Sequence, residues 1–448
     1  MKFRSILTVT ALILIMFMAA IETSIISLAL PTIKINLHAG NLVSLVFTVY
    51  FIALVIANPI VGELLSRFKI LYIAVAGVSL FAIGSLMSGL SETFTFLIIS
   101  RMIQGFGAGV MMSLSQIVPK LAFEIPLRYK IMGIVGSVWG ISSIIGPILG
   151  GAILEFATWH WLFFINIPIA IIAIVLVLMT FHFPEEEHGN QTHFDVKGLS
   201  IFYIFIALLM FGLLNQQHLY LNIIAIILAL LVLVGLFKIE QKQNNPFLPT
   251  NEFNRSIMLA FITDLFIAMS LIGYNLYIPV YLQEQLGLSP LQSGFVILPL
   301  SVAWIILNFN LAKIEANFTR KALYISAFTV LLICSVIILF GMKVPLLIAF
   351  SVIFAGLSFG YVYTKNSVIV QEESSPRNMK KMMSFYALTK NLGSSVGSTI
   401  MGYMYALKSG LFGTHLHNVL GLIAVISICL SMTVSYTHLR AHETKANL

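Results

Sequence analysis

Apolar stretches long enough to cross a lipid bilayer recur from one end of this 448-residue chain to the other. A spanning helix needs about 20 mostly apolar residues. The chain is 59% hydrophobic and only 9% charged, whereas soluble domains carry about 25% charged residues. The composition therefore predicts an all-α membrane protein with many spanning helices.

Polar and charged positions divide the apolar stretches into fourteen predicted helices, with Asn215–His218 as the break between the seventh and the eighth. The helices are predicted at 5–32, 42–62, 71–91, 94–118, 130–156, 162–182, 198–216, 219–239, 256–283, 291–312, 321–341, 345–370, 381–407 and 413–435. Only Lys34, Lys343 and Lys408 among the basic residues lie at predicted external ends. Because cytoplasmic loops are enriched in lysine and arginine, both termini are predicted to be cytoplasmic. The net charge of +8 then reflects topology, and nucleic-acid binding is not expected.

Two polar loops divide the predicted helices into groups of six, two and six. The predicted units are an amino-terminal bundle at 1–184, an inserted helix pair with its loops at 185–254, and a carboxyl-terminal bundle at 255–436. The polar stretch 437–448 is interpreted as a tail or a sequence scar without function. The two cysteines lie inside apolar runs, and neither a disulfide nor a metal site is predicted.

Glu22 lies well inside the first apolar run, in "AAIETSIIS", and an ionisable group there is expensive and functional by default. Arg101 lies at a similar depth, about 12 Å from the outer end of its own helix. Burial favours a protonated carboxyl group, whereas a nearby guanidinium favours the ionised form. The Glu22–Arg101 pair is therefore predicted to take up and release a proton at Glu22 as its surroundings change. The alternative is a permanent ion pair that only holds two helices together.

A second set of charges lies in the carboxyl-terminal half. Asp264 is about two turns from the cytoplasmic end of its helix, Lys390 lies at a similar depth, and Lys365 lies in the cytoplasmic part of 345–370. Asp264 paired with either lysine would form an inner gate or a second proton site. A structural pair near the membrane interface is the alternative.

Three glycine-containing motifs predict close helix contacts. "RMIQGFGAGVMMS" (Arg101–Ser113) and "GISSIIGPILGG" (Gly140–Gly151) lie within helices, and "GELLSRFK" (Gly62–Lys69) lies at a cytoplasmic turn. In the second motif Gly146 and Pro147 permit a kink, and Gly140, Gly150 and Gly151 leave the surface smooth enough to slide. In the third, Gly62 permits close approach, and Arg67 and Lys69 reach helix carbonyls or a neighbouring acid.

Aromatic and amide side chains are predicted to line a weakly polar cavity suited to flat lipophilic cations. The candidates are Trp139, Tyr274, Asn275, Tyr361 and Asn366, together with Tyr277, Tyr363 and Trp304. The sequence has no nucleotide-binding loop and no catalytic triad, so an enzyme is not expected.

Taken together, these motifs resemble the major facilitator superfamily, in particular its fourteen-helix drug/proton antiporters. The resemblance rests on "RMIQGFGAG", on "GPILGG", on "WHWLFFINIPI" (Trp159–Ile169), and on two stretches in the carboxyl-terminal half, Tyr281–Pro299 and Thr389–Ser398. It covers residues 1–435. The chain departs from the family pattern at Glu22, where aspartate is usual, and at Ser66, where the loop motif usually has an acid.

The resemblance implies a major facilitator fold and a monomeric exporter of amphipathic or cationic drugs in a bacterial cytoplasmic membrane. Export would be driven by the proton gradient without a cofactor, and the partners would be drugs, protons and the bilayer. A tetracycline/proton or monovalent-cation/proton antiporter of the same fold is the nearest alternative. A non-transporting receptor or lipid-handling protein is the alternative from another class.

Overall fold

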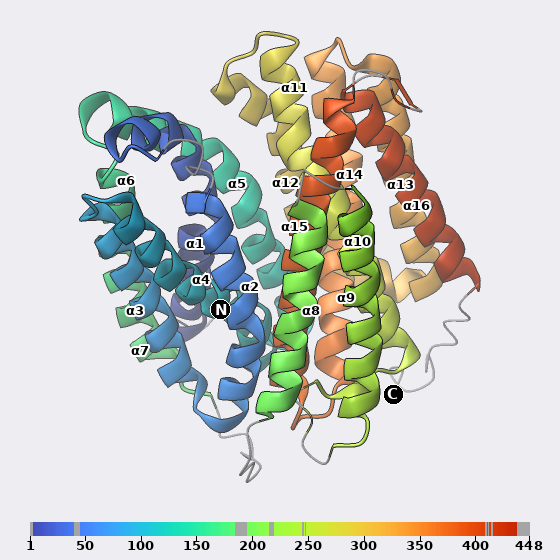
Figure 1. Cartoon of the computed structure of the whole chain (residues 1–448). Helices are drawn as coiled ribbons and strands as arrows, with labels where there is room; N and C mark the ends of the chain where they lie inside the picture. The colour runs from blue at the N-terminus through green and yellow to red at the C-terminus, as the bar shows by residue number, and fades with distance from the viewer. Residues whose placement is uncertain are drawn as a thin grey trace.

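The computed structural model describes residues 3–39, 45–183, 195–214, 219–243, 246, 248–407, 410, 412–413 and 415–436. Nearly all of these residues are helical (Figure 1). The all-α fold class predicted from the composition is confirmed. The predicted break at Asn215–His218 and the tail at 437–448 lie outside the described residues.

The amino-terminal half is built from helices that pack closely on one another. They are α1 (Phe3–Asn36), α2 (Leu45–Arg67), α3 (Ile70–Gly89), α4 (Phe94–Ala122), α5 (Leu127–Phe156), α6 (Trp161–Phe164) and α7 (Asn166–Thr180). α4 packs against both α2 and α3, while α1 packs against α5 and α7. Only Ile165 separates α6 from α7, so these two segments together occupy the predicted span 162–182.

The carboxyl-terminal half has a corresponding set of helices. They are α10 (Arg255–Ile272), η3 (Gly273–Tyr277), α11 (Ile278–Glu284), α12 (Pro290–Asn317), α13 (Arg320–Gly341), α14 (Pro345–Glu373), α15 (Met379–Ala406) and α16 (Leu416–Tyr436). α10, η3 and α11 are continuous, and η3 is a π-helical turn of the kind often found at functional sites. α14 packs against α12 and α13, and α15 packs against α10.

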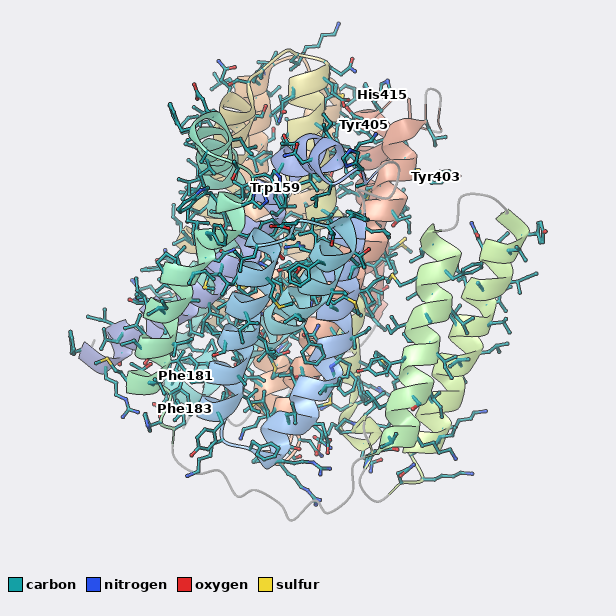
Figure 2. The ribbon with its side chains drawn as sticks, turned by 60° about the vertical axis from the view of Figure 1, so that its left-hand side comes forward. Trp159, Phe181, Phe183, Tyr403, Tyr405 and His415 are labelled. Atoms are coloured by element: carbon teal, nitrogen blue, oxygen red, sulfur yellow. The ribbon has the colours of Figure 1, made fainter. Side chains whose placement is uncertain are left out.

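A separate helix pair, α8 (Val196–Leu214) and α9 (Leu219–Glu240), stands beside the two halves (Figure 2). The Tyr203 hydroxyl donates a hydrogen bond of 2.8 Å to the Ile56 carbonyl on α2. The Phe202 ring and the Phe385 ring of α15 pack in a T-shaped arrangement, with centroids 6.1 Å apart. The pair therefore contacts one helix from each half, and a short turn, η2 (Thr250–Glu252), follows it.

Thirteen helical segments in the described part of the chain are long and apolar enough to cross a membrane. α15 has 28 residues, which exceeds the length a span requires, but it is more polar and includes Lys380, Lys381 and Lys390. With α15 included, the predicted count of fourteen is confirmed approximately. Most contacts of α1–α7 and of α10–α16 lie within each group, while α5 also packs on α12 and α2 on α15. The predicted boundaries at 184 and 254 stay a prediction.

The predicted topology assigns one end of the molecule to the cytoplasm and the other to the external side. Phe181 and Phe183 mark the end assigned to the cytoplasm, and Trp159, Tyr405 and His415 mark the opposite end (Figure 2). The orientation of the termini stays a prediction from the pattern of basic residues.

The glycines of α4 allow its neighbours to approach at backbone distance. A Cβ atom on Gly105 would collide with the Tyr50 carbonyl of α2. One on Gly107 would collide with the Phe81 backbone nitrogen of α3. The motif that begins at Arg101 therefore packs α4 tightly between α2 and α3, and this packing holds the Arg101 side chain in the interior.

A glycine stripe on α5 forms part of the contact between the two halves. Gly133, Gly136 and Gly140 lie three and four residues apart, so they share one helix face. Their neighbours on α12 are Asn308, Trp304 and Ser301, in that order. Gly133 and Gly136 were not singled out from the sequence, because nothing local indicates that α12 is their partner.

The rest of the α5 motif has mixed surroundings. Gly146 and Gly150 are buried, but Gly151 is exposed and a Cβ atom there would meet nothing within 4 Å. The backbone at Pro147 is helical, and its side chain lies outside the described residues. A role for this motif in motion stays a prediction.

The packing predicts different outcomes for two glycine-to-alanine changes. Gly107→Ala inserts a methyl group against the α3 backbone and is expected to cost about 1–3 kcal/mol. Gly151→Ala, the control, adds a methyl group in open space and raises helix propensity, so stability should stay the same or rise slightly. Thermal unfolding midpoints in detergent measure both changes. Equal midpoints for the two variants would contradict the packing described for α4.

Candidate functional site

Glu22 and Arg101 form an ion pair in the interior of the amino-terminal half. Arg101 Nη1 donates to Glu22 Oε1, and the two residues are 0% and 1% exposed, respectively. The partners come from α1 and α4, and they lie 79 residues apart in the sequence. Removing one partner of such a pair costs about 3–5 kcal/mol because the other charge is left buried and uncompensated.

Arg101 is held by further contacts from two helices. Its Nε donates to the Val46 carbonyl at 3.1 Å, and its Nη1 also donates to Gln104 Oε1 at 2.6 Å. The guanidinium lies over the Tyr50 ring, 4.3 Å from its centroid. A guanidinium over an aromatic face is stabilised by the ring quadrupole. Arg101 is therefore held in place by several contacts besides Glu22.

Asn166 completes the carboxylate's environment, although it was not singled out from the sequence. Its Nδ2 donates to Glu22 Oε2 at 2.8 Å and to Ser85 Oγ at 2.9 Å. The Ser85 hydroxyl in turn donates to the Phe163 carbonyl at 2.8 Å. Asn166 stands within "WHWLFFINIPI", which was interpreted only as an aromatic interface segment. The sequence signal that could have identified Asn166 is a single amide at the start of an otherwise apolar helix.

The site also holds polar atoms with spare bonding capacity. Tyr50 Oη, Arg101 Nη2 and Gln104 Nε2 are buried and have no hydrogen-bond partner among the described residues. Such atoms are uncommon in protein interiors, where most polar groups are satisfied. Polar atoms that can form further hydrogen bonds therefore lie beside the Glu22–Arg101 pair.

Asp264 is the corresponding buried acid of the carboxyl-terminal half. It is 0% exposed, and Asn366 Nδ2 donates to its Oδ1 at 2.7 Å. The Lys390 ammonium lies 3.9 Å from Asp264 Oδ2. Asn366 also donates to Thr263 Oγ1 at 2.8 Å and accepts from the Tyr324 hydroxyl. Of the two candidate lysines, Lys390 is the one beside Asp264.

Lys365 has a different partner, on α12. Its Nζ lies 2.6 Å from Glu315 Oε1, and the Tyr129 hydroxyl of α5 donates to Glu315 Oε2 at 2.7 Å. Glu315 therefore connects one helix of the amino-terminal half to two of the other half. Glu315 was not identified from the sequence, because its partners lie on distant segments.

Other polar contacts join the two halves at their cytoplasmic ends. Lys120 Nζ lies 2.5 Å from Glu372 Oε1, and Arg128 Nη1 donates to the same oxygen. Gln371 Nε2 donates to the Gln116 carbonyl at 2.8 Å. These contacts close α4 and α5 against α14.

A buried ion pair joins α2 and α15 at the same end. Glu63 Oε2 lies 2.5 Å from Lys381 Nζ, with both side chains at most 5% exposed. Arg67 binds the other oxygen of Glu63 through Nε at 2.9 Å and Nη2 at 2.6 Å. The Ser66 hydroxyl donates to the Glu63 carbonyl. Glu63, which was not singled out from the sequence, therefore supplies the acid that the loop motif lacks at Ser66.

The loop motif also brings two backbones together. A Cβ atom on Gly62 would lie 2.9 Å from the Ser384 Cβ and 3.2 Å from the Lys381 Cα on α15. The small residue therefore permits the close approach that the Glu63–Lys381 pair needs. Lys69 stands just before α3.

Glu252 ties the loop after α9 to the loop between α14 and α15. It accepts hydrogen bonds from the Ser375 nitrogen at 2.9 Å, the Ser375 hydroxyl at 2.5 Å and Asn378 Nδ2 at 2.7 Å. Partial burial by itself would raise the pKa of Glu252, but these hydrogen bonds lower that pKa below its ordinary value. The carboxylate that holds the two loops together is thus kept ionised.

A small cavity of about 40 Å³ lies between the two halves. Its lining residues are Met16, Ser115, Gln116, Met132, Val135, Gly136, Trp304, Tyr363, Thr364 and Lys390. The Trp304 and Tyr363 rings are stacked, with centroids 5.4 Å apart. Pockets for drug-sized ligands measure about 300–1,000 Å³, so the halves have to separate before a drug fits here.

The other predicted cavity residues lie elsewhere in this conformation. Tyr274 is buried, and its hydroxyl shares a hydrogen bond of 2.8 Å with Ser335 Oγ on α13. Tyr361 packs edge-on against Tyr324. Asn366 belongs to the Asp264 network, and Trp139 and Asn275 are half-buried without being part of the cavity lining. Their role in substrate binding stays a prediction.

Two helical halves with buried charges in their spanning helices, joined by polar contacts at one end, define a multi-pass membrane transporter. The chain belongs to the major facilitator superfamily, which it matches over residues 12–398. The family and the major facilitator fold expected from the sequence motifs are thereby confirmed, and the chain is a transporter rather than an enzyme.

Individual relatives support this assignment. The chain is 73% identical over 428 residues to "Multidrug efflux pump SdrM" of Staphylococcus aureus (strain N315), with 96% of each chain covered. It is 26% identical over 416 residues to "Multidrug transporter protein MdtP" of Bacillus subtilis (strain 168), covering 90% of this chain and 76% of that relative. The human organic anion transporter MFSD10 (TETRAN) shares the fold with a TM-score of 0.72 at 14% identity, covering 96% of this chain and 99% of that one.

The Glu63–Lys381 pair predicts how the cytoplasmic closure responds to mutation. Glu63→Gln leaves the buried Lys381 ammonium without its carboxylate, so the equilibrium should move toward separated cytoplasmic ends. Lys381→Met should have a similar effect, and the double variant should add little because both changes remove one interaction. Distances between spin labels on the cytoplasmic ends of α2 and α15 measure the shift.

The control is Glu373→Gln. Glu373 lies 3.4 Å from Arg320 within a single half, and both side chains are more than a quarter exposed, so the label distances should stay unchanged. Fully additive effects of Glu63→Gln and Lys381→Met would contradict a closure that depends on their pair.

Proposed function

We propose that the chain exports amphipathic or cationic drugs in exchange for protons, with the two halves alternately exposing a central cavity to either side of the membrane. The observation that carries the proposal is the buried Glu22–Arg101 pair, whose carboxylate also accepts a hydrogen bond from Asn166. The similarity to a multidrug efflux pump at 73% identity supports drugs as the substrate class.

Glu22 is proposed to carry the proton. Its ionised form is stabilised by Arg101, and its neutral form is favoured by the surrounding apolar helices. Protonation removes the charge that binds Arg101, whose guanidinium then depends on Gln104, Val46 and the Tyr50 ring. Because the pair joins α1 to α4, a proton at Glu22 alters the contact between two helices.

Other residues of the site are proposed to serve the same cycle. Asp264 with Lys390 is a second charge site in the other half, and Lys365 with Glu315 belongs to the cytoplasmic closure. Gly62, Arg67 and Lys69 are proposed to hold the loop that carries Glu63 in place for this closure. The α5 motif, from Gly140 to Gly151, is proposed to let α5 move against α12 while the membrane stays sealed.

Energy comes from the proton gradient in this proposal, and no cofactor is required. The membrane potential supplies about 2.3 kcal/mol per elementary charge per 100 mV. The protein is proposed to act as a monomer in a bacterial cytoplasmic membrane, since each bundle supplies its own buried acid. The bacterial location follows from the Staphylococcus aureus relative.

One alternative remains as an outcome of the test. A tetracycline/proton or monovalent-cation/proton antiporter would use the same fold and the same acid. The 73% identity to a multidrug efflux pump argues against the non-transporting receptor or lipid-handling protein. The stacked Trp304 and Tyr363 rings in the cavity favour a flat aromatic substrate over a bare metal cation.

Proton release from inside-out vesicles with an acidified lumen tests the proposal. Ethidium should release protons from vesicles that contain the wild-type protein, whereas Glu22→Gln should abolish release because the amide does not titrate. Glu22→Asp should keep partial activity, because aspartate titrates and is the usual residue of the family at this position. Arg101→Ala should impair both binding and coupling, because it leaves Glu22 buried without a cation.

Glu155→Gln makes the same chemical change at an exposed position near the external end of α5, and its proton release should equal that of the wild type. Release by tetracycline or potassium but not by ethidium would identify one of the alternative antiporters. Equal ethidium-driven release in wild type and Glu22→Gln would exclude Glu22 as the essential proton carrier.

A further inference from the structure

The Lys390 ammonium lies in a cage formed by four groups. Its Nζ is 4.4 Å from the centroid of the Tyr363 ring and 4.6 Å from that of Tyr386. It is also 3.9 Å from Asp264 Oδ2 and 3.4 Å from Gln116 Oε1. Two aromatic faces, one carboxylate and one amide oxygen therefore surround a single cation.

Aromatic faces and acceptor oxygens are the groups that stabilise an ammonium or phosphonium ligand. Aromatic rings attract cations through their quadrupole, most strongly when the cation has lost its water. Asp264 is 0% exposed, and its Oδ2 has no hydrogen-bond partner among the described residues. Asp264 thus places its carboxylate, the negative charge of the cage, beside the cation.

The cage opens onto the cavity between the two halves. Lys390, Tyr363 and Gln116 all line that cavity, and so does Trp304, whose ring stacks on that of Tyr363. Gln116 comes from α4, whereas Lys390, Tyr363 and Asp264 come from the other half. The occupant of the cage therefore touches both halves, as a transported substrate has to do.

We propose that Lys390 is a tethered competitor for the cationic substrate: its ammonium occupies the Tyr363–Tyr386–Asp264 cage until the cationic group of a drug displaces it. This inference rests on the proposed function and names the cationic subsite within it. A single buried carboxylate compensates one cation, so the drug and the lysine exclude each other. Withdrawal of the four-carbon side chain also enlarges a cavity of about 40 Å³.

The competition makes Lys390 a specificity-determining residue. A ligand that brings only a charge gains no more from the cage than Lys390 already does. A ligand that adds flat aromatic surface gains further contact with Trp304 and Tyr363. Lipophilic aromatic cations are therefore selected over small amines and metal cations.

Equilibrium binding of tetraphenylphosphonium to the full-length protein in lipid nanodiscs tests this inference. Removing the competitor in Lys390→Met should tighten binding at least about tenfold, which is the scale of one desolvated cation–aromatic contact. Lys390→Arg keeps a cation and should bind like the wild type. The double variant Asp264→Asn, Lys390→Met should lose the gain, because the carboxylate that attracts the ligand is gone.

Lys130→Met is the matched control. The Lys130 ammonium also lies over an aromatic ring, 5.5 Å from the Phe309 centroid, but Lys130 is not part of the cavity lining. Its removal should leave the dissociation constant unchanged. Lys390→Gln provides a second neutral variant if Lys390→Met does not fold, and it should show the same gain.

Unchanged or weaker binding in a folded Lys390→Met or Lys390→Gln protein would overturn the inference and make Lys390 a structural partner of Asp264. An equal gain in Lys130→Met would also overturn it, because the effect would then come from net charge. All variants keep Glu22 and are compared at one pH without a gradient, so a change in the dissociation constant reports competition at Lys390 and requires no transport. Failure of coupling at Glu22 and failure of competition at Lys390 are therefore separate results.

Discussion

The cost of a charge in a medium without water is the constraint on which the rest of the structure depends. Glu22 remains in the spanning part of α1 because Arg101 supplies the opposite charge and Asn166 an amide hydrogen. Those partners have to be brought to one point from α4 and α7. The glycines of α4 permit the close packing that holds Arg101 there, so the helix contacts and the charge site are one arrangement.

The same constraint explains how the two halves are joined. Their cytoplasmic ends meet through the partly exposed Lys120–Glu372 pair and the buried Glu63–Lys381 pair, and both lie at the end of the molecule, where separation of the halves admits water. Deeper in the membrane the contact is made by the glycine stripe of α5 against α12. Ion pairs at the cytoplasmic ends and a contact of small residues between α5 and α12 are suited to two helix bundles that rock against each other.

The sequence was most informative where a residue conflicts with its surroundings. Glu22 and Arg101 were identified because ionisable groups are rare in apolar runs, and depth along each helix was enough to pair them. Glu63, Glu315 and Gln116 were missed because their meaning depends on partners far away in the chain. Likewise, helix length and apolar pattern predicted the spans, but no local signal tells which glycine of α5 faces Trp304.

The central claim is that a drug and a proton at Glu22 are alternatives, and calorimetry of ethidium binding in buffers of different ionisation enthalpy tests it directly. The dependence of the apparent heat on the buffer gives the number of protons released per drug bound. The wild-type protein should release protons when ethidium binds, and Glu22→Gln should release about one fewer because that site no longer titrates. Identical proton release from both proteins at every pH would contradict the account.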